Sequence, residues 1–149
     1  MEESNFRFPL FVDLTGRRCV IIGGGKIALR RAEILLSFGA EVTLIAPVCT
    51  APPAGAAYEA RPYENGDLEG AFLAVAATDN RRVNRTVGEE ARRAGIFVSV
   101  ADRREESTFY FPAICCGGDL VAGVVSRGEN HTKTARAAQT IRTVLEESE

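Results

Sequence analysis

The fold of this chain is decided by the stretch Arg17-Arg18-Cys19-Val20-Ile21-Ile22-Gly23-Gly24-Gly25-Lys26-Ile27-Ala28. An apolar run stops at three glycines and continues as an amphipathic segment, which predicts a buried strand, a tight turn and the first turn of a helix. Gly23 and Gly25 can adopt backbone angles closed to other residues, and the small Ala28 lets the helix pack against the strand. The amides and the dipole at the start of the helix then favour a bound diphosphate.

The three glycines could also form a simple strand-to-helix connection. That alternative is hard to justify, because each glycine costs roughly 0.5–1 kcal/mol of order in a regular element. The pattern Gly-x-Gly-x-x-Ala, placed between a strand and a helix, therefore favours a nucleotide site. We predict that the nucleotide contacts Gly23, Gly24, Gly25, Lys26 and Ile27.

Apolar strands alternate with helical segments as far as residue 101. In chain order we expect a helix over 27–38, a strand over 41–46, a short strand over 58–63, a strand over 71–77, a helix over 82–94 and a strand over 96–101. This alternation is typical of a doubly wound parallel α/β sheet of the Rossmann type. Thr78, at the end of the fourth strand, is expected beside the nicotinamide ribose, although a β-branched residue can also simply pack.

The end of the second strand departs from the simplest NAD pattern. The acid that would hold the ribose hydroxyls is replaced by Ala46-Pro47, so we expect ribose contacts from the backbone around Ala46, Pro47 and Val48. Neither arginine nor lysine follows, which removes the usual contact with a 2′-phosphate. The pattern favours NAD over NADP, and we assign residues 1–105 to an NAD-binding Rossmann domain.

Residues 106–149 follow a different pattern. Extended residues 109–114, a glycine turn, a strand over 120–126 and a helix over 132–147 predict an antiparallel hairpin with one amphipathic helix. This is a poor independent core, so we predict a dimerisation and substrate-pocket segment that packs against a second copy of the chain. Residues 6–14 are expected to lie along the core as an extended arm.

Composition narrows the functional classes. The 149 residues carry a net charge of −2, which gives no general reason to bind nucleic acid or an anionic membrane. The apolar runs are too short for a bilayer and no leader pattern is seen at the N-terminus, so we expect a cytoplasmic protein. The four cysteines lack Cys-x-x-Cys spacing and His131 is the single histidine, so no metal site is predicted.

Several motifs together resemble one family. They are Phe8-Pro9-Leu10-Phe11-Val12-Asp13-Leu14, the triple glycine with Lys26-Ile27-Ala28, Val42 through Pro47, Ala76-Ala77-Thr78-Asp79 with Asn84, Val100-Ala101-Asp102, and Phe111-Pro112-Ala113-Ile114. The chain is similar to the precorrin-2 dehydrogenase family, the N-terminal domain type of sirohaem synthase, some of whose members are also sirohydrochlorin ferrochelatases. The resemblance implies NAD-dependent oxidation of precorrin-2 to sirohydrochlorin by a homodimer.

The resemblance also implies roles for particular residues. Asp102 matches the aspartate that the family needs for chemistry, and Ser126 matches the serine of a Ser-x-Gly loop, here Ser126-Arg127-Gly128. Arg127 stands where the family often has glycine, and Asn130-His131 where Ser-Pro is frequent. Since precorrin-2 carries several carboxylates, Arg103, Arg104, Arg127 and Arg136 are candidates to bind it, with solvated surface arginines as the alternative.

Three alternatives stay open at this point. Asp102 could instead cap a helix or form a salt bridge with Arg103 or Arg104, and His131 could be a surface histidine and not a base for iron insertion. The whole chain could also be a nucleotide-sensing regulatory module without catalysis, for which neither Asp102 nor the Phe-Pro-Ala-Ile hairpin would be needed.

Overall fold

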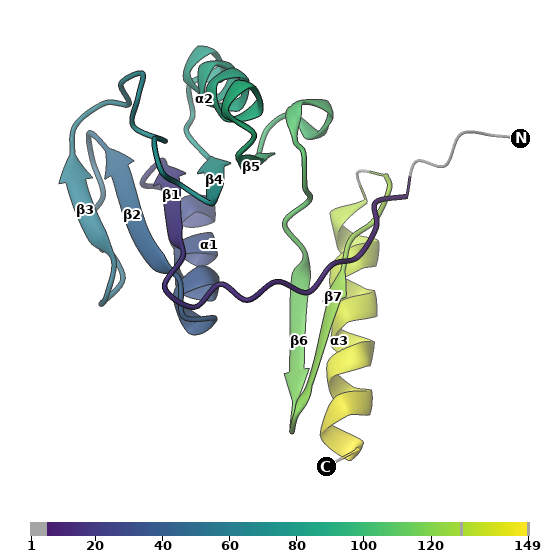
Figure 1. Cartoon of the computed structure of the whole chain (residues 1–149). Helices are drawn as coiled ribbons and strands as arrows, with labels where there is room; N and C mark the ends of the chain where they lie inside the picture. The colour runs from purple at the N-terminus through teal and green to yellow at the C-terminus, as the bar shows by residue number, and fades with distance from the viewer. Residues whose placement is uncertain (1–5, 129, 149) are drawn as a thin grey trace, which may run out of the picture. The chain divides into compact units, whose positions relative to one another are not determined.

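The computed structural model describes residues 6–128 and 130–148 and divides them into two compact units (Figure 1). One unit is Val12–Phe109, and the other combines residues 6–11 with the described part of 110–148. Within these residues, no helix combines the length and apolar character that a bilayer crossing needs.

The first unit is built on a five-stranded parallel sheet. Its strands are β1 (Arg18–Ile22), β2 (Glu41–Ala46), β3 (Ala57–Ala60), β4 (Leu73–Ala76) and β5 (Phe97–Val100), in the order β3-β2-β1-β4-β5. Val20 of β1 lies opposite Thr43 and Ala74 in the ladder. The chain adds strands on one side of β1 and then on the other, so the strand order reverses between β1 and β4. Ligands of doubly wound sheets bind at such a point, beyond the carboxyl ends of the strands.

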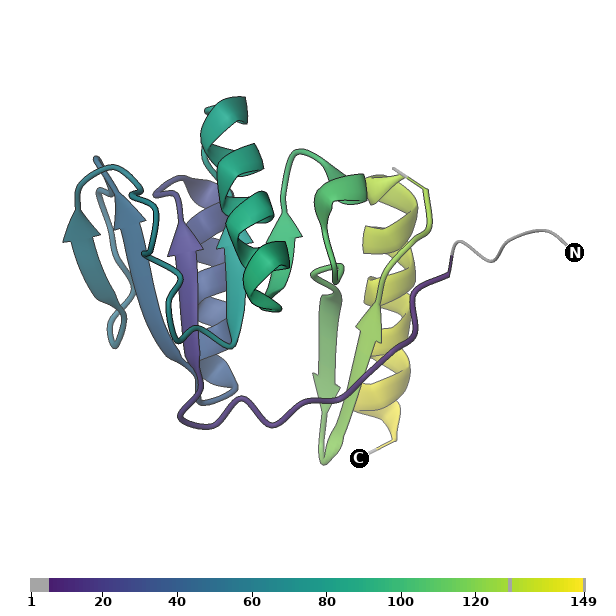
Figure 2. The same ribbon diagram turned by 45° about the horizontal axis from the view of Figure 1, so that its top comes forward.

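Helices α1 (Lys26–Ser37) and α2 (Arg81–Ala94) cover opposite faces of this sheet (Figure 2). Val20 and Ile22 of β1 join the buried cluster that contains Val87 and Ala91 of α2. Their neighbours in β1 point to the other face because strand side chains alternate. Both faces of β1 are buried, which confirms the predicted doubly wound α/β fold and explains the continuous apolar run in the sequence.

Residues after β5 extend this unit beyond the predicted boundary at residue 105. The short 3-10 helix η1 (Arg104–Glu106) leads into Thr108, whose backbone N–H donates to Val98 O at 2.9 Å. Thr108 Oγ1 accepts from Val98 N–H, also at 2.9 Å, and the Phe109 ring meets the Phe97 ring edge to face. This segment thus satisfies the free edge of β5, a role that its polar sequence did not reveal.

The second unit is the predicted hairpin and helix. Strands β6 (Ala113–Gly117) and β7 (Leu120–Val124) pair antiparallel, and α3 (His131–Glu147) packs on them. The approach is close at Gly117, where an added Cβ would lie 2.6 Å from Leu145 Cβ. Cys115 and Ala138 are this unit's buried apolar residues, whereas Leu120, Val121, Val125 and Val144 are exposed by 40–55%. Among its described residues, this unit therefore buries few apolar side chains and leaves these four largely exposed.

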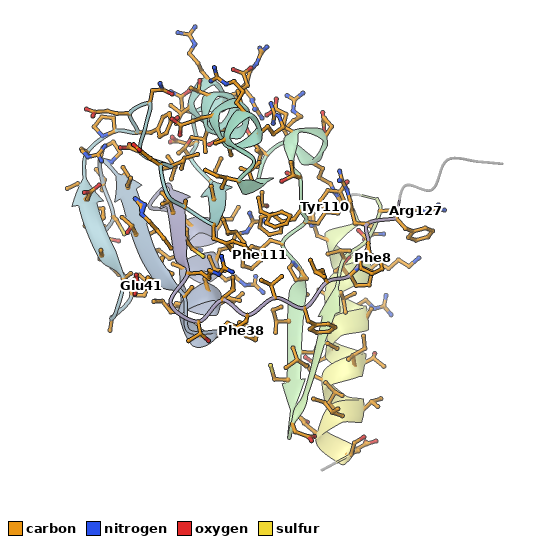
Figure 3. The ribbon with its side chains drawn as sticks, viewed as in Figure 1. Phe8, Phe38, Glu41, Tyr110, Phe111 and Arg127 are labelled. Carbon is orange, nitrogen blue, oxygen red and sulfur yellow. The ribbon has the colours of Figure 1, made fainter. Side chains whose placement is uncertain are left out.

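The prediction that residues 6–14 lie along the core is wrong for the apolar side chains of this segment. Phe6, Phe8, Leu10 and Phe11 are 65–85% exposed. Two cation–π contacts join this segment to its own unit (Figure 3): Arg127 lies 4.7 Å over the Phe6 ring, and Arg7 lies 4.5 Å over the Tyr110 ring. Without a strand ladder to join, the segment makes local cation–π contacts and leaves its apolar groups in solvent.

Cys19 gives this fold a testable pH dependence. Burial raises the pKa of its thiol from 9.0 to about 11, so above pH 9 the unfolded chain loses this proton before the folded chain does. The free energy of unfolding should therefore fall as the pH rises from about 9 to 11. Urea titrations should show a fall about 2 kcal/mol larger for the native chain than for Cys19→Ala. Parallel pH profiles of the two proteins would contradict this account.

Candidate nucleotide-binding site

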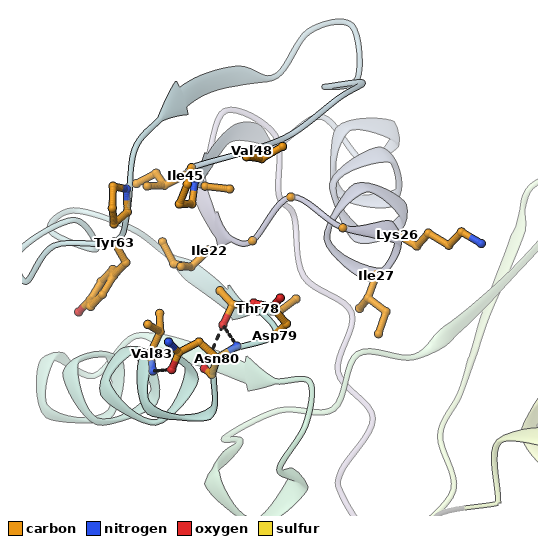
Figure 4. Close-up of a pocket in the computed structure, with 17 residues that line it drawn as sticks. Ile22, Lys26, Ile27, Ile45, Val48, Tyr63, Thr78, Asp79, Asn80 and Val83 are labelled. Carbon is orange, nitrogen blue, oxygen red and sulfur yellow. Dashed lines mark hydrogen bonds between the residues drawn. The ribbon is translucent and has the colours of Figure 1, made fainter.

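A cavity of about 710 Å³ lies beyond the carboxyl ends of β1, β2 and β4 (Figure 4). It lies in the Val12–Phe109 unit. Its lining comes from the glycine turn and the segments after β2, β3 and β4: Ile22, Gly23, Gly24, Gly25, Lys26, Ile27, Ile45, Ala46, Pro47, Val48, Pro62, Tyr63, Ala77, Thr78, Asp79, Asn80 and Val83. A cavity of this size at the switch point of a parallel sheet is suited to a cofactor-sized ligand.

The first two glycines of the turn are required by the packing of the protein itself. Gly23 has φ +139°, and a Cβ there would lie 2.2 Å from the Ala77 carbonyl oxygen. A Cβ on Gly24 would lie 2.2 Å from the Val48 carbonyl oxygen. The turn therefore passes between the segments that follow β4 and β2, and only a chain without side chains fits there.

Gly25 is different, because nothing in the fold requires a glycine at this position. Its backbone angles are ordinary, at φ −88° and ψ −172°, and an added Cβ would meet nothing within 4 Å. Gly25 is the N-cap of α1, which has neither a side-chain cap nor an acidic residue in its first turn. The first backbone bond at this end runs from Leu29 N–H to Gly25 O, so the preceding amides are available to an anion.

The wall at the end of β2 has no charged group. The Ala46 carbonyl accepts a hydrogen bond from the Tyr58 hydroxyl at 2.9 Å, and Val48 is 73% exposed. Of the seventeen residues around the cavity, Lys26 and Asp79 are the charged ones, and neither follows β2. This end is suited to apolar and backbone contacts with a ribose and a base.

Thr78, labelled in Figure 4, is held in place by the side chain of Asn84 in α2. Asn84 is only 1% exposed. Asn84 Oδ1 accepts from the Thr78 backbone N–H at 3.0 Å and from its hydroxyl at 2.7 Å, while Asn84 Nδ2 donates to Thr78 O at 3.0 Å. All polar groups of Thr78 are thus engaged inside the protein. A ligand would therefore meet Thr78 by van der Waals contact, and Asn84 fixes the position of the Thr78 side chain.

The structure brings the nine predicted cofactor residues together around this one cavity: Gly23, Gly24, Gly25, Lys26, Ile27, Ala46, Pro47, Val48 and Thr78. Their contacts with a nucleotide stay a prediction. Sequence reasoning missed the other lining residues, among them Asp79 and Asn80 after β4 and Val83 of α2. It also missed Pro62 and Tyr63, which the segment after β3 brings to the cavity.

Asp102 follows β5 and does not line this cavity. Its side chain is 39% exposed, and its Oδ1 lies 2.7 Å from Arg81 Nη1. Arg81 also contacts Glu106, so one guanidinium holds two carboxylates. The ion pair of Asp102 is thus formed with Arg81, which the sequence did not suggest, while Arg103 pairs with Glu105 at 3.6 Å. The chemical role of Asp102 stays a prediction.

The four predicted substrate residues belong to different units. Arg103 and Arg104 follow β5, whereas Ser126 and Arg127 follow β7. The Ser126 hydroxyl donates to Gly128 O at 2.7 Å, and Arg127 stacks on Phe6. Among residues 6–128 and 130–148, no group of three or more histidine, cysteine or acidic side chains is placed to hold a metal ion.

Comparisons with known proteins agree with this geometry. A family model described as "Putative NAD(P)-binding" matches residues 10–113. The chain is 42% identical over 145 residues to "Probable multifunctional siroheme biosynthesis protein HemA" of Ruminiclostridium josui, covering 93% of this chain and 28% of that protein. It is 40% identical over 127 residues to "Siroheme synthase" of Azotobacter vinelandii, covering 81% and 27%. The chain therefore spans about a quarter of the length of these curated relatives.

A solved structure, "SirC, precorrin-2 dehydrogenase", superposes with a TM-score of 0.79 at 26% identity, covering 95% of this chain and 73% of its own. The fold and the site define a Rossmann-type NAD(P)-binding domain. Within that class, the chain belongs to the precorrin-2 dehydrogenase and sirohydrochlorin ferrochelatase family, the N-terminal domain type of sirohaem synthase.

A substitution at Gly25 should affect NAD binding without destabilising the fold, so it can test the two roles of the glycine turn separately. Gly25→Ala should change the free energy of unfolding by no more than about 1 kcal/mol, because its Cβ enters open space. It should weaken NAD binding about tenfold or more, the loss expected when one amide can no longer donate to a charged phosphate. Calorimetric titration and urea unfolding measure the two effects.

Gly24→Ala is the matched comparison, since its Cβ would collide with the Val48 carbonyl. This variant should lose about 1–3 kcal/mol of stability. Unchanged NAD affinity in Gly25→Ala would overturn the assignment of the anion site.

Proposed function

We propose that the chain catalyses the NAD-dependent dehydrogenation of precorrin-2 to sirohydrochlorin in sirohaem biosynthesis. The observation that carries the proposal is the open space at Gly25 in front of the uncapped start of α1, in a cavity whose charged lining residues are Lys26 and Asp79 alone. The similarity to sirohaem synthases and to a precorrin-2 dehydrogenase supports the choice of substrate.

The reaction removes a hydride and a proton from the reduced macrocycle and extends its conjugation. Bound NAD⁺ supplies the hydride acceptor. The amides of the first α1 turn bind its diphosphate, and Thr78, fixed by Asn84, shapes the wall after β4. Asp102 accepts the proton, and Arg81 fixes the direction in which this carboxylate is presented.

The cofactor is NAD in preference to NADP. A 2′-phosphate on the adenosine ribose would need a cation after β2, and the lining there consists of Ala46, Pro47 and Val48. The backbone of these residues can contact the ribose hydroxyls, whereas a dianionic phosphate would lose its hydration without a charged partner.

The residues proposed to bind the substrate are Ser126, Arg127, Arg103 and Arg104. The guanidinium cations of the three arginines suit the acetate and propionate groups of precorrin-2. A homodimer completes the enzyme, and the uncovered apolar surface of the hairpin and α3 supports this part of the proposal.

Incubation with precorrin-2 and NAD tests the whole proposal. The absorbance spectrum of sirohydrochlorin should appear together with NADH, and NADP should support a slower reaction. Ferrous ion added to the same mixture tests ferrochelatase activity, which would convert the product to sirohaem. NAD binding without any turnover would instead support a nucleotide-sensing module and reject the dehydrogenase.

Asp102→Ala should lower kcat about 100-fold or more, which is the usual contribution of a positioned proton acceptor. NAD affinity should stay within about twofold, because Asp102 does not line the cofactor cavity. Glu41→Ala is the matched control. Glu41 is an exposed carboxylate at the start of β2, whereas the cavity lies beyond the end of that strand (Figure 3). Equal turnover of the two variants would remove Asp102 from the chemistry.

Val144→Glu should convert the proposed dimer into a monomer of 16.1 kDa. Val144 is 55% exposed on α3, and a buried charge without a partner is costly in an interface. Light scattering after size exclusion measures the mass. Gln139→Glu, another new charge on an exposed position of α3, should leave the dimer intact. A wild-type monomer would contradict this part of the proposal.

A further inference from the structure

Tyr63 occupies the side of the cavity that lies away from Lys26 and Ile27 (Figure 4). Its hydroxyl points away from the glycine turn and is buried. Glu90 Oε2 of α2 is buried as well, and within the described residues neither atom has a hydrogen bond of standard geometry. Burial first, and then the nearby Glu90 carboxylate, raise the pKa of the phenol, so the hydroxyl stays protonated and can face the carboxylate as a donor.

Glu90 also holds the loop that carries Tyr63. Its other carboxylate oxygen accepts from the backbone N–H of Gly66. The loop is closed on itself by Arg61, which donates to both carboxylate oxygens of Asp67 at 2.9 Å, and by the Glu64 N–H bond to Asp67 at 2.7 Å. The position of the Tyr63 ring is therefore fixed from α2 and from within its own loop.

The neighbours of this ring define the chemistry of the ligand group that fits beside it. Tyr63 and Val83 pack against the same apolar cluster, and Pro62 precedes Tyr63 in the lining. All three are uncharged, so this side of the cavity is unsuited to the diphosphate and suited to a planar base. In Rossmann sheets the ribose next to the end of the second strand belongs to the adenosine half of the dinucleotide. Tyr63 comes from the segment after β3, and β3 pairs directly with β2.

The geometry points to Tyr63 as the wall on which the adenine base of the dinucleotide packs, with Glu90 as the residue that positions its ring. This inference deepens the proposed function and rests on it. It also accounts for the absence of charge after β2: the adenosine half is held by ring contact and backbone, and a carboxylate at the ribose is not required. Glu90 acts from behind the ring and does not touch the ligand.

The experiment uses tyrosine emission, because the chain has no tryptophan and three tyrosines, Tyr58, Tyr63 and Tyr110. In the double variant Tyr58→Phe with Tyr110→Phe, the remaining emission comes from Tyr63. ADP-ribose and NAD should change this emission with saturation at their binding affinities. Nicotinamide mononucleotide, which lacks adenine, should leave it unchanged.

Affinities measured by calorimetry provide the second arm. Tyr63→Ala should weaken ADP-ribose binding about tenfold, whereas Tyr63→Phe, which keeps the ring, should stay within about twofold of the native chain. Glu90→Ala should weaken ADP-ribose binding and Glu90→Gln should restore it, with nicotinamide mononucleotide affinity unchanged in both.

The possible outcomes distinguish a failure of the Tyr63 assignment from a failure of the proposed function. If the native chain binds neither NAD nor ADP-ribose, the proposed function fails. If it binds NAD while Tyr63 emission does not respond and Tyr63→Ala keeps full affinity, the proposed function stands and the role of Tyr63 is rejected. If Tyr63→Ala does not fold, the emission of the Tyr63-only protein decides the matter alone.

Discussion

The site depends on one steric constraint, the passage of the glycine turn between two backbone carbonyls. Ala77 O at the end of β4 and Val48 O beyond β2 each leave no room for a Cβ, at Gly23 and Gly24 respectively. The segments after β2 and β4 can approach each other this closely only because Gly23 and Gly24, which pass between them, have no side chains. That convergence places the start of α1 at the floor of the cavity and aims its amides into it. The proposed anion site therefore follows from the packing of the glycine turn against the segments after β2 and β4.

A second, polar constraint acts at the other wall. Asn84 is buried in a helix whose neighbours on the same face are apolar, and burying an amide without partners would be costly. Both polar atoms of the Asn84 side-chain amide, Oδ1 and Nδ2, form hydrogen bonds with Thr78. Asn80 meanwhile caps α2 through the amides of Arg82 and Val83. The start of α2 and the end of β4 are thus tied into one rigid corner, which leaves the amides of α1 and not those of α2 open to a ligand.

The sequence predicted the sheet, its reversal and the cavity's main lining because those features are local. An apolar run that ends in glycines, a helix that begins with a small residue and a strand that ends in Ala46-Pro47 each contain their own structural signal. It could not predict that Tyr63 reaches the cavity, since that depends on Glu90 of α2 holding Gly66 in a distant loop. The ion pair of Asp102 with Arg81 could not be predicted for the same reason. Arg81 is 21 residues away in sequence, whereas Arg103 and Arg104 directly follow Asp102. The exposed Phe6, Phe8 and Phe11 show the reverse error, because apolar character alone does not place a segment in the core.

The two units of the chain contribute differently to the candidate sites. Every lining residue of the nucleotide cavity belongs to Val12–Phe109, so the steric and hydrogen-bonding relations among them are internal to one compact body. The candidate substrate residues are split between that body and the hairpin unit, whose own core is little more than Cys115 and Ala138. The hairpin unit thus buries little apolar surface, whereas the Val12–Phe109 unit has an extended buried core of its own. The lining of the proposed cofactor site therefore comes from one unit alone, whereas the candidate substrate residues come from both units.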